Sequence, residues 1–521
     1  MGIKKASFKR YEMNQPLLLP PSLDELIPEK HLVRTLNEMI ERMDLKYLYA
    51  SYEGGGASSF HPLMMLKVLI FAYSQKIYSS RMIAKALREN INFMWLSGNN
   101  FPDFRTVNRF RLRLHDKIDE IFSEILHYLS EQGYIDLTNY FIDGTKIEAN
   151  ANKYSYVWKG STVYLKSKLK EKVKELLKKV DEVNEEENSL YGDKDLEELG
   201  EGVEINSEML EKTVETLNKK LNGIDNEVKK KEYKQGVKKI EKELLPRMRK
   251  YENHEKVLGD RNSFSKTDND ATFMRLKEDR MQNGQLKAAY NAQIGTENQF
   301  VVGYSIHQKT TDTSLLIDHI EKAKILNKGK KPKNIIGDAG YGSEENYDYL
   351  EKQNINAYVK YNNFHYERKK RFQTNRFRVE NLEYDKTKDE FTCPAGKKLK
   401  YVNTKEYKTT NGYLTDRRYY QCEDCTDCAL RANCHNSKYN RTIQYSPTLA
   451  EMKAKAREKL NSEKGIELRK KRCVEVESVF GQIKQDYSFR RFGLRSLEKV
   501  NLEWGLVCLA HNIKKIAVAK T

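Results

Sequence analysis

Two aspartates stand where an apolar run of the sequence gives way to glycine. Asp143 follows Tyr140-Phe141-Ile142, and Asp338 follows Ile335-Ile336-Gly337. Such runs predict short strands, and a carboxylate at the carboxyl end of a strand lies at the sheet edge where α/β proteins bind ligands. Two such acids on neighbouring strands can share divalent cations, because Mg²⁺ prefers hard oxygen ligands. The alternative is that both are ordinary turn or N-cap aspartates.

A third acid and a lysine lie in a predicted helix near the C-terminus. Val476 and Phe480 mark the buried stripe of this helix. Glu477 and Lys484 are seven residues apart, so on an α-helix they lie almost on one line, two turns from each other. An acid for a metal ion and a lysine for a phosphate on one face suit phosphoryl transfer, whereas Glu475 points to roughly the opposite side. The alternative is an exposed Glu and Lys on an amphipathic helix.

Five of the seven cysteines fall between residues 393 and 434. A Cys-Pro-x-Gly turn at Cys393 is followed by Cys-x2-Cys-x2-Cys-x5-Cys, which is typical of a structural zinc ribbon with four thiolate ligands. One of the five is then spare, and we predict that it is Cys422, because the turn supplies a separated ligand. The predicted Zn²⁺ ligands are Cys393, Cys425, Cys428 and Cys434. Reduced cysteines without metal are the alternative.

Cations alternate with aromatic residues in two further stretches, 365–378 and 489–492. Such stretches suit phosphate contacts and base stacking, although a solvated charged face has the same composition. Trp158 is a candidate for stacking on a displaced base. The side chains predicted to contact DNA from these segments are Arg368, Lys369, Arg371, Arg490, Arg491 and Trp158.

The composition also favours a nucleic-acid partner. Among 521 residues, Lys and Arg outnumber Asp and Glu by 93 to 75, which gives a net charge of +18. No apolar run approaches the ~18–20 residues of a membrane span, and residues 1–21 lack the apolar stretch of a signal peptide. We therefore expect a cytoplasmic, nucleoid-associated protein without membrane contact, whose cysteines are thiols or metal ligands rather than disulfides.

The apolar periodicity indicates which elements position these residues. Residues 1–134 are predicted to be helical, and a helix, a polar break and an Arg-rich helix around residues 105–113 fit a helix-turn-helix or an ordinary bundle equally well. Residues 161–262 are rich in Lys and Glu with helical spacing of apolar residues, which predicts two long antiparallel helices. Strands and helices alternate from 263 to 380, with a hairpin at 286–306 and candidate helix caps at Asp312, Thr313 and Ser314, and this alternation predicts an α/β domain.

The length implies several domains. We predict a helical DNA-binding domain at 1–134 and an α/β catalytic core split between 135–160 and 263–380. A helical insertion at 161–262 interrupts the core, a cysteine-rich module follows at 381–446, and a helical segment with Glu477 at 447–521 completes the core.

The segments around the acids resemble DDE transposases of bacterial insertion sequences. The resemblance is carried in order by residues 143–154 with Trp158, 267–271, 290–293, 337–341, 476–484 and 511–512. The N-terminal region is similar to the helical InsH-like domain of these proteins. The match extends over nearly the whole chain.

The resemblance implies a ribonuclease-H-like mixed sheet in which Asp143, Asp338 and Glu477 bind two Mg²⁺ or Mn²⁺ ions. It also implies a homodimer acting on double-stranded DNA, namely the terminal inverted repeats and the target, with Lys484 on a phosphate. In the family signature Tyr-x2-Arg-x3-Glu-x6-Lys, Cys473 stands in place of the arginine. Arg472, one residue displaced, is the candidate replacement for a DNA contact.

We therefore predict a DNA transposase that cleaves insertion-sequence ends and joins them to target DNA. A metal-dependent nuclease without strand transfer would use the same acids. A catalytically silent DNA-binding protein derived from a transposase would not need all three.

Overall fold

The computed structural model describes residues 21–50, 52, 58–191, 205–221, 227–276 and 284–519. The chain forms two compact units, one of residues 1–134 and 505–521 and the other of residues 135–504. Residues 1–20 lie outside the described residues. So do Gly192 and residues 200–202, where a break between the helices of the insertion is expected. None of the described helices combines the length and apolarity that a bilayer span requires.

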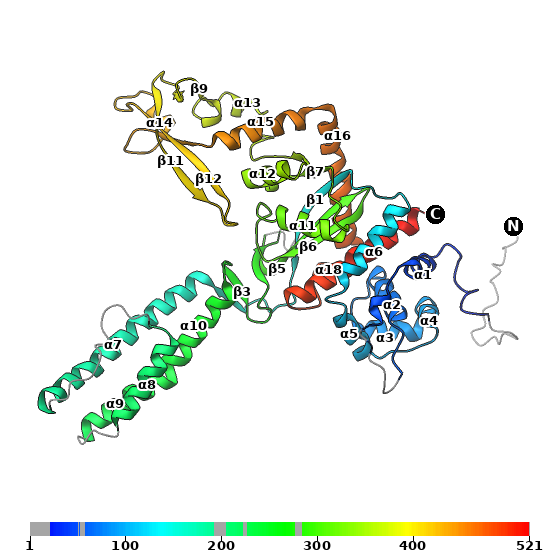
Figure 1. Ribbon diagram of the computed structural model, residues 1–521, viewed down its shortest axis with the longest axis horizontal. Helices are drawn as coiled ribbons and strands as arrows, with labels where there is room; N and C mark the ends of the chain where they lie inside the picture. Colours follow the sequence, from blue (N-terminus) through cyan, green and yellow to red (C-terminus); the bar gives the residue numbers. More distant parts are fainter. Residues whose placement is uncertain are drawn as a thin grey trace, which may run out of the picture. The chain divides into compact units, whose positions relative to one another are not determined.

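The first unit is helical, as predicted (Figure 1). Apolar residues at three- and four-residue spacing bury one face of its first helix, and the helix after it is buried on nearly all sides. A short 3₁₀ turn, Lys46–Leu48, lies between these two. The helices are α1 (Leu32–Arg42), α2 (Pro62–Ser74), α3 (Ser80–Glu89), α4 (Ile91–Ser97), α5 (Phe104–Arg113), α6 (Ile118–Glu131) and the part of α18 (Leu497–Ala519) from Gly505 onward.

The polar break expected before the Arg-rich helix contains a helix of its own. Asn90 caps α4 by accepting a hydrogen bond from the Asn92 amide, and α4 ends at Gly98 in the left-handed region. The expectation of a simple break was therefore wrong, although α3 and α5 do pack against each other. Arg111 of α5 is buried and donates to the main-chain oxygen of Tyr78 at 2.9 Å, so it is part of the core.

The centre of the second unit is a mixed sheet with helices packed on it, which confirms the predicted α/β class. Its path runs β4-β5-β1-β7-β8, with β6 paired to β5. β1 is antiparallel to β5 and parallel to β7, and β7 is parallel to β8. The strands are β1 (Asn139–Glu148), β4 (Thr272–Arg275), β5 (Leu286–Glu297), β6 (Phe300–His307), β7 (Asn334–Gly337) and β8 (Asn356–Val359).

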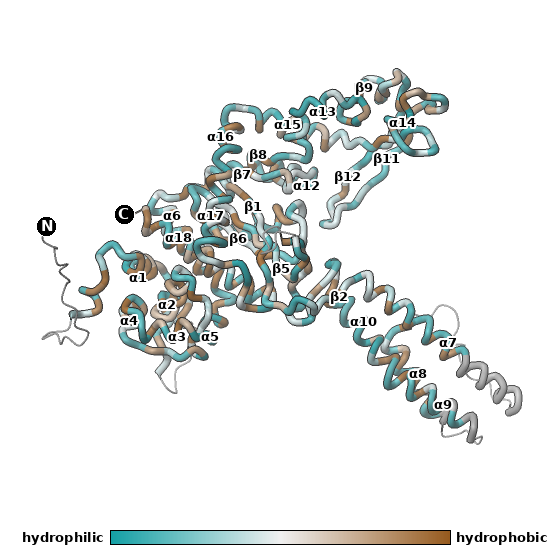
Figure 2. The backbone as a smooth tube through the Cα atoms, turned by 180° about the vertical axis from the view of Figure 1, so that it is seen from behind, coloured by the Kyte–Doolittle hydropathy of each residue, from teal (hydrophilic) through white to brown (hydrophobic). Residues whose placement is uncertain are grey.

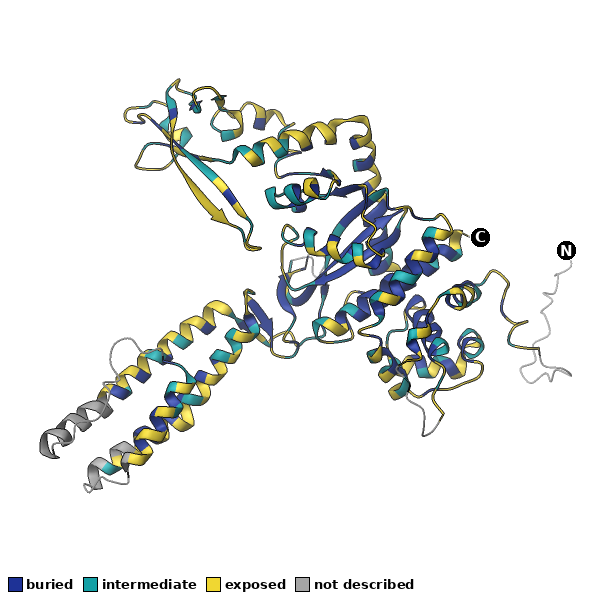
Figure 3. Cartoon of the chain, viewed as in Figure 1, coloured by how far each residue is buried: buried dark blue, intermediate teal, exposed yellow. Residues whose placement is uncertain are grey.

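Helices cover this sheet and supply its apolar contacts. α11 (Leu316–Leu326) packs on β6, and α12 (Glu344–Lys352) packs on β8. α15 (Pro447–Asn461) also packs on β8, and α16 (Glu463–Arg472) lies against β7 and β8. The chain continues through a π-helical turn (Cys473–Glu477), α17 (Ser478–Gly481), a second π-helical turn (Gln482–Asp486) and α18. The central strands are mostly buried (Figure 3).

The insertion has more helices than the two that were predicted. α7 (Lys159–Tyr191) packs against α10 (Leu245–Leu258) and α9 (Glu227–Lys239), while α8 (Ser207–Leu221) packs against α9 and α10. A π-helical turn, Ile240–Leu244, joins α9 to α10. These helices are mainly hydrophilic (Figure 2), but they share an apolar core that includes Leu169, Leu210, Ile240 and Met248. At the base of the insertion, β2 (Tyr156–Trp158) pairs with β3 (Ser263–Ser265).

The cysteine-rich segment contains an antiparallel sheet of order β13-β12-β11-β10-β9. Phe391, Leu399, Tyr420 and Ile443 form its apolar cluster. The distal part of its longest hairpin is largely exposed (Figure 3). A short helix, α13 (Lys370–Gln373), and a 3₁₀ turn (Val379–Asn381) precede this sheet. The elements that follow are β9 (Glu383–Asp385), β10 (Glu390–Thr392), β11 (Lys398–Lys408), β12 (Leu414–Cys422), α14 (Arg431–Cys434) and β13 (Thr442–Tyr445).

Two glycines of the hairpin β5–β6 make room for a tyrosine of β1. A Cβ atom on Gly295 would lie 1.7 Å from Cζ of Tyr140, and one on Gly303 would lie 2.2 Å from its hydroxyl oxygen. Tyr140 is fully buried, and its hydroxyl hydrogen-bonds His319 Nε2 at 2.7 Å. The ring therefore has no room to move aside.

We expect Gly295→Ala to lower the free energy of unfolding by about 3 kcal/mol, because an overpacked core must shift backbone or force side chains off their rotamers. Chemical denaturation of the two proteins measures this difference. Gly160→Ala is the matched control, because a Cβ atom there meets nothing within 4 Å. Equal unfolding midpoints for Gly295→Ala and wild type would contradict the packing argument.

Candidate active site

Three acids from distant parts of the chain line one cleft of the second unit. Asp143 comes from β1, Asp338 directly follows β7, and Glu477 ends the π-helical turn after α16. The cleft has a volume of about 710 Å³. Its charged lining residues are Asp143, Lys146, Glu148, Lys287, Asp312, Asp338, Arg472, Glu477, Lys484 and Arg490.

Asp143 does not end its strand, contrary to the sequence prediction, because β1 continues to Glu148. The change from apolar to polar residues marks instead the point at which β1 is no longer paired with β7. Its parallel pairing with β7 ends at Phe141, whereas its pairing with β5 continues to Glu148. Asp143 therefore lies beside the end of β7, close to Asp338, although its own strand runs on.

Asp338 caps the short 3₁₀ turn Ala339–Tyr341, as the turn alternative proposed. Its carboxylate accepts a hydrogen bond from the Gly340 amide at 2.8 Å. Asp143 similarly accepts from the Gly144 amide at 2.9 Å. These amide contacts orient both carboxylates, and both side chains also line the cleft.

Arg472 lies between two of the acids. Its guanidinium is 3.1 Å from Asp143 and 3.6 Å from Glu477, and its side chain is only 9% exposed. Nε has no partner among the described residues. The π-helical turn explains the one-residue displacement from the family signature, because residues five apart align in a π-helix as residues four apart do in an α-helix. Arg472 and Glu477 therefore lie on one face.

The electrostatics of the cleft favour a bound cation. Burial raises the pKa of Asp143 to about 6, Arg472 opposes this shift, and the neighbouring charges of Asp338 and Asp312 add to it. Neighbouring carboxylates whose charges repel each other are oxygen donors of the type that a hard divalent ion prefers. Within the described part of the chain, no three Asp, Glu, His or Cys side chains are grouped closely enough to ligate one ion in this conformation.

Glu475 points away from the cleft, as predicted. Its side chain is buried and accepts a hydrogen bond from the Gln299 amide at 2.6 Å. Lys471 lies 3.7 Å from its other oxygen. Glu475 thus anchors this helix to the turn between β5 and β6.

Besides Arg472 of α16, four basic side chains line the cleft. Lys484 lies on the second π-helical turn and Arg490 follows it, while Lys146 and Lys287 extend from β1 and β5. Arg490 donates to Gln485 at 2.6 Å, which keeps its guanidinium near Lys484. These cations lie on the same cleft as the acids.

Two of the residues predicted to contact DNA do not line the cleft. Arg491 donates to the main-chain oxygens of Ala149 at 3.2 Å and Ala151 at 3.0 Å, so it fastens the segment after β1. Trp158 packs beside Tyr156 and Phe273, with ring centroids 6.0 and 5.9 Å away.

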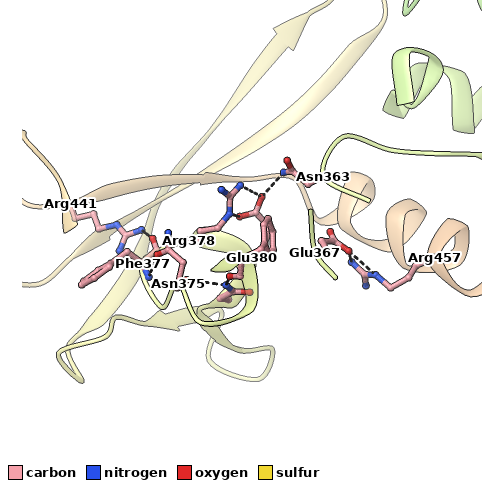
Figure 4. Close-up of polar contacts among 10 residues, drawn as sticks. Asn363, Glu367, Asn375, Phe377, Arg378, Glu380, Arg441 and Arg457 are labelled. Atoms are coloured by element: carbon pink, nitrogen blue, oxygen red, sulfur yellow. Dashed lines mark hydrogen bonds and ion pairs between the residues drawn. The ribbon is translucent and has the colours of Figure 1, made fainter. Parts of the chain in front are cut away.

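The stretch 365–378 also lies outside the cleft lining. Arg368 stacks over Phe364 and bonds Asn461, and Lys369 lies over Tyr366. Arg371 is exposed on α13. Intramolecular contacts hold the surrounding segment (Figure 4): Arg378 pairs with Glu380, which also bonds Asn363, Arg457 pairs with Glu367, and Arg441 donates to the main-chain oxygen of Phe377.

The five clustered cysteines line one small cavity of about 20 Å³, together with His435. Arg441 donates from its guanidinium to Cys434 Sγ at 3.2 Å and from its main-chain amide to Cys425 Sγ at 3.4 Å. Both ring nitrogens of His435 are buried without a partner among the described residues. Cys422 is buried and donates to the main-chain oxygen of Asp424 at 3.7 Å. Thiolate and imidazole groups are the donor types that bind a thiophilic ion such as Zn²⁺, although no three of these described side chains are grouped closely enough to ligate one ion in this conformation.

Several residues in or beside the cleft and the cysteine cavity were not predicted as site residues from the sequence. Asn291 and Gln293 alternate on β5, and this polar spacing of two within a buried strand was a visible signal. Asp312 was assigned to a helix cap, yet α11 begins at Leu316 with Leu315 as its N-cap and no side-chain cap bond. His435 was adjacent to a predicted ligand.

Arg472 should stabilise the folded protein when no metal ion is bound, because it pairs with Asp143 and Glu477. We expect Arg472→Gln to lower the free energy of unfolding in EDTA by about 2 kcal/mol, below the value for a fully buried pair because Glu477 is 57% exposed. Mn²⁺ should then raise the melting temperature of the variant more than that of wild type, because the ion restores the lost positive charge. Lys464→Gln, an exposed change on α16, is the control. Equal Mn²⁺-induced shifts in all three proteins would rule out this role.

Comparisons with known proteins bear on two separate parts of the chain. A family model described as "Transposase domain (DUF772)" matches residues 21–113, and one described as "Transposase DDE domain" matches residues 392–517. The second match includes the cysteine cluster, Glu477 and Lys484. Asp143 and Asp338 lie outside both matches.

Two curated relatives are similar over a shorter stretch. Each is described as a "Probable transposase for insertion sequence element ISH11", one from Halobacterium salinarum strain R1 and one from strain NRC-1. Each is 29% identical over 114 residues, which cover 22% of this chain and 33% of the relative. The match thus spans about a third of the length of these relatives. No solved structure matches the chain. The two family matches and these relatives show that parts of this chain are similar to transposases, including those of an insertion sequence.

Proposed function

We propose that this protein is a DNA transposase that cuts the ends of an insertion sequence and joins them to target DNA. The observation that carries the proposal is one cleft lined by Asp143, Asp338 and Glu477 together with Lys484 and Arg472. The mixed sheet supports a ribonuclease-H-like core, with the first acid on its middle strand and the second after the parallel neighbour.

Asp143, Asp338 and Glu477 would hold two Mg²⁺ or Mn²⁺ ions. The chemistry that such ions supply is activation of the attacking oxygen and stabilisation of the leaving 3′-oxygen. The chain itself positions the carboxylates, through the Gly144 and Gly340 amides and the Arg472 guanidinium. No covalent protein nucleophile is required, since water and then the freed 3′-hydroxyl serve as nucleophiles.

The cations of the cleft would bind the DNA backbone. Lys484 provides a compact point charge for a phosphate near the cleaved end, and Arg490, Lys146 and Lys287 extend the positive surface. Arg472 is close enough to the acids to hold them before a metal binds and to contact a phosphate afterwards. Arg368, Lys369 and Arg371 would contact DNA beyond the cleft.

The remaining parts have supporting roles in this proposal. The helical domain at 1–134 would bind the terminal inverted repeats, and two copies of the chain would pair two DNA ends. The cysteine cavity would hold one structural Zn²⁺ through Cys393, Cys425, Cys428 and Cys434. The S–H contact of Cys422 with Asp424 supports its place as the spare thiol.

The test is incubation of the full chain with labelled DNA that carries the element's own ends, in Mg²⁺ and separately in Mn²⁺. Strand-specific nicks at the element ends followed by joined products are the expected result. Nicks without joined products would favour the nuclease, and binding without nicks in either metal would favour the silent DNA-binding protein. The proposal fails in both of those cases.

A further inference from the structure

A fourth carboxylate approaches the same cleft from a loop that the sequence assigned to helix capping. Asp312 precedes α11 by four residues, and only its main-chain oxygen serves the turn, by accepting from the Leu315 amide at 2.9 Å. Its carboxylate turns toward β5 instead. There Oδ1 accepts hydrogen bonds from Asn291 Nδ2 at 2.7 Å and from Gln293 Nε2 at 2.9 Å.

These two amides orient the carboxylate. Gln293 is fully buried, and its own oxygen accepts a hydrogen bond from the Tyr341 hydroxyl, so its amide nitrogen has to face Asp312. Both bonds end on Oδ1. No hydrogen bond from the described residues reaches Oδ2, which leaves this oxygen available to a ligand.

Asp312 lies beside Gly144 of β1 and beside the 3₁₀ turn that Asp338 caps. A Cβ atom on Gly144 would lie 2.0 Å from Gln293 Nε2 and 3.0 Å from Asp312 Oδ1. One on Gly340 would lie 3.8 Å from Asp312 Oδ2 and 3.0 Å from Asp338 Oδ1. Thr313 fixes this approach by donating to the main-chain oxygen of Gly340 at 2.8 Å. Gly144 and Gly340 thus leave room for the Asp312 carboxylate and for the Gln293 amide that binds it.

The neighbouring cation indicates that this group of acids requires positive charge. Arg472 is more than nine-tenths buried, contacts Asp143 and Glu477, and leaves its Nε without a partner among the described residues. Its guanidinium contacts are to those two acids, so Asp312 and Asp338 have no ion pair with it. A divalent ion beside these two aspartates would balance the remaining negative charge.

We propose that Asp312 is a further metal-binding residue of the site, with Oδ2 as a ligand of the ion held by Asp143 and Asp338. This inference rests on the proposed function, since it assigns one more ligand to the same metal site. Asn291 and Gln293 are positioning residues, because they hold Oδ1 and thereby aim Oδ2 at the ion. A carboxylate is needed at this position, since the amide nitrogen of asparagine does not bind Mg²⁺ or Mn²⁺.

The experiment is a titration of the full chain with Mn²⁺, in which the electron paramagnetic resonance signal reports the free ion. Wild type should bind two Mn²⁺ ions, and Asp312→Asn should bind one of them at least about tenfold more weakly. The variant keeps an oxygen for the two amide bonds. Asp318→Asn is the matched control, because Asp318 is an exposed residue on the first turn of α11. Melting temperatures in EDTA show whether each variant is folded.

The possible outcomes separate the inference from the function on which it rests. Mn²⁺ binding that is lost in Glu477→Gln but unchanged in Asp312→Asn overturns only the role of Asp312. If wild type and Glu477→Gln bind no Mn²⁺ in the cleft, the proposed metal site fails as a whole. Weaker binding accompanied by a lower melting temperature in EDTA means that Asp312 is structural, and this also overturns the inference.

A measurement on wild type alone covers the case in which Asp312→Asn does not fold. Fe²⁺ replaces Mg²⁺, and ascorbate with peroxide generates hydroxyl radicals that cut the main chain beside the bound ion. The expected cuts lie near residues 143, 312 and 338, and excess Mg²⁺ should suppress them. Cuts near 143 and 338 without a cut near 312 overturn the proposal.

Discussion

Glu477→Gln should reduce strand cleavage at the element ends by at least about 10³-fold at saturating Mg²⁺, with DNA binding retained. Removing one carboxylate ligand weakens the stabilisation of charge that develops on the attacking and leaving oxygens, where such electrostatic effects are largest. Glu477 is 57% exposed, so the folded structure should tolerate the uncharged amide. Rates of nick formation on labelled DNA ends measure the effect, and a gel shift measures binding.

Glu475→Gln is the comparison that separates chemistry from folding. Glu475 lies two residues away on the same π-helical turn, but it is buried and bonds the Gln299 amide. We expect this change to lower the melting temperature and to leave the cleavage rate of the folded fraction within a few-fold of wild type. Cleavage by Glu477→Gln at the wild-type rate would falsify the assignment of this acid.

Cys425→Ser should abolish zinc binding and unfold the cysteine-rich module. Structural zinc contributes on the order of 10 kcal/mol to small domains that fold around it. The apolar cluster of this module is small, and Cys425 itself belongs to it. Metal analysis should find one zinc per wild-type chain and none in the variant, and proteolysis should cut the variant within residues 381–446.

Cys422→Ser provides the matched test of which thiols bind. It lines the same cavity three residues earlier, so both changes remove one thiol from the same place. We expect Cys422→Ser to keep its zinc, because Cys393, Cys425, Cys428 and Cys434 remain. Loss of zinc from both variants would mean that Cys422 is a ligand and that Cys393 is the spare thiol. Zinc-free wild type with unchanged protease resistance would contradict the metal site.

The elements of the central sheet could be predicted from the sequence because each has a simple local signal. The hairpin β5–β6 and strand β7 follow from short apolar runs that are bounded by turn residues. The end of β1 could not be predicted from the polar residue Asp143. That residue marks where β1 is no longer paired with β7, whereas the strand itself continues beside β5. The partition of the insertion into α8, α9 and α10 depends on packing between helices, which periodicity does not encode.

Some residues of the candidate site could be predicted from the sequence, and others could not. Asp338 and Glu477 lie where strand and helix patterns located them. The displaced Arg472 required the structure, because a π-helical turn changes which residues share a face and has no sequence signature. Asp312 was missed because Asp-Thr-Ser before an apolar helix favours capping, while the competing amides of Asn291 and Gln293 lie about twenty residues away.

The short β2–β3 pair has a consequence for how this protein can change over time. Trp158 lies opposite Ser263 in that pair. The two ends of the helical insertion are therefore held at neighbouring backbone positions. Residues can be gained or lost between them without shifting the register of β1 against β5, on which the spacing of the acids depends. We therefore expect a shortened insertion between β2 and β3 to leave the pairing of β1 with β5 unchanged.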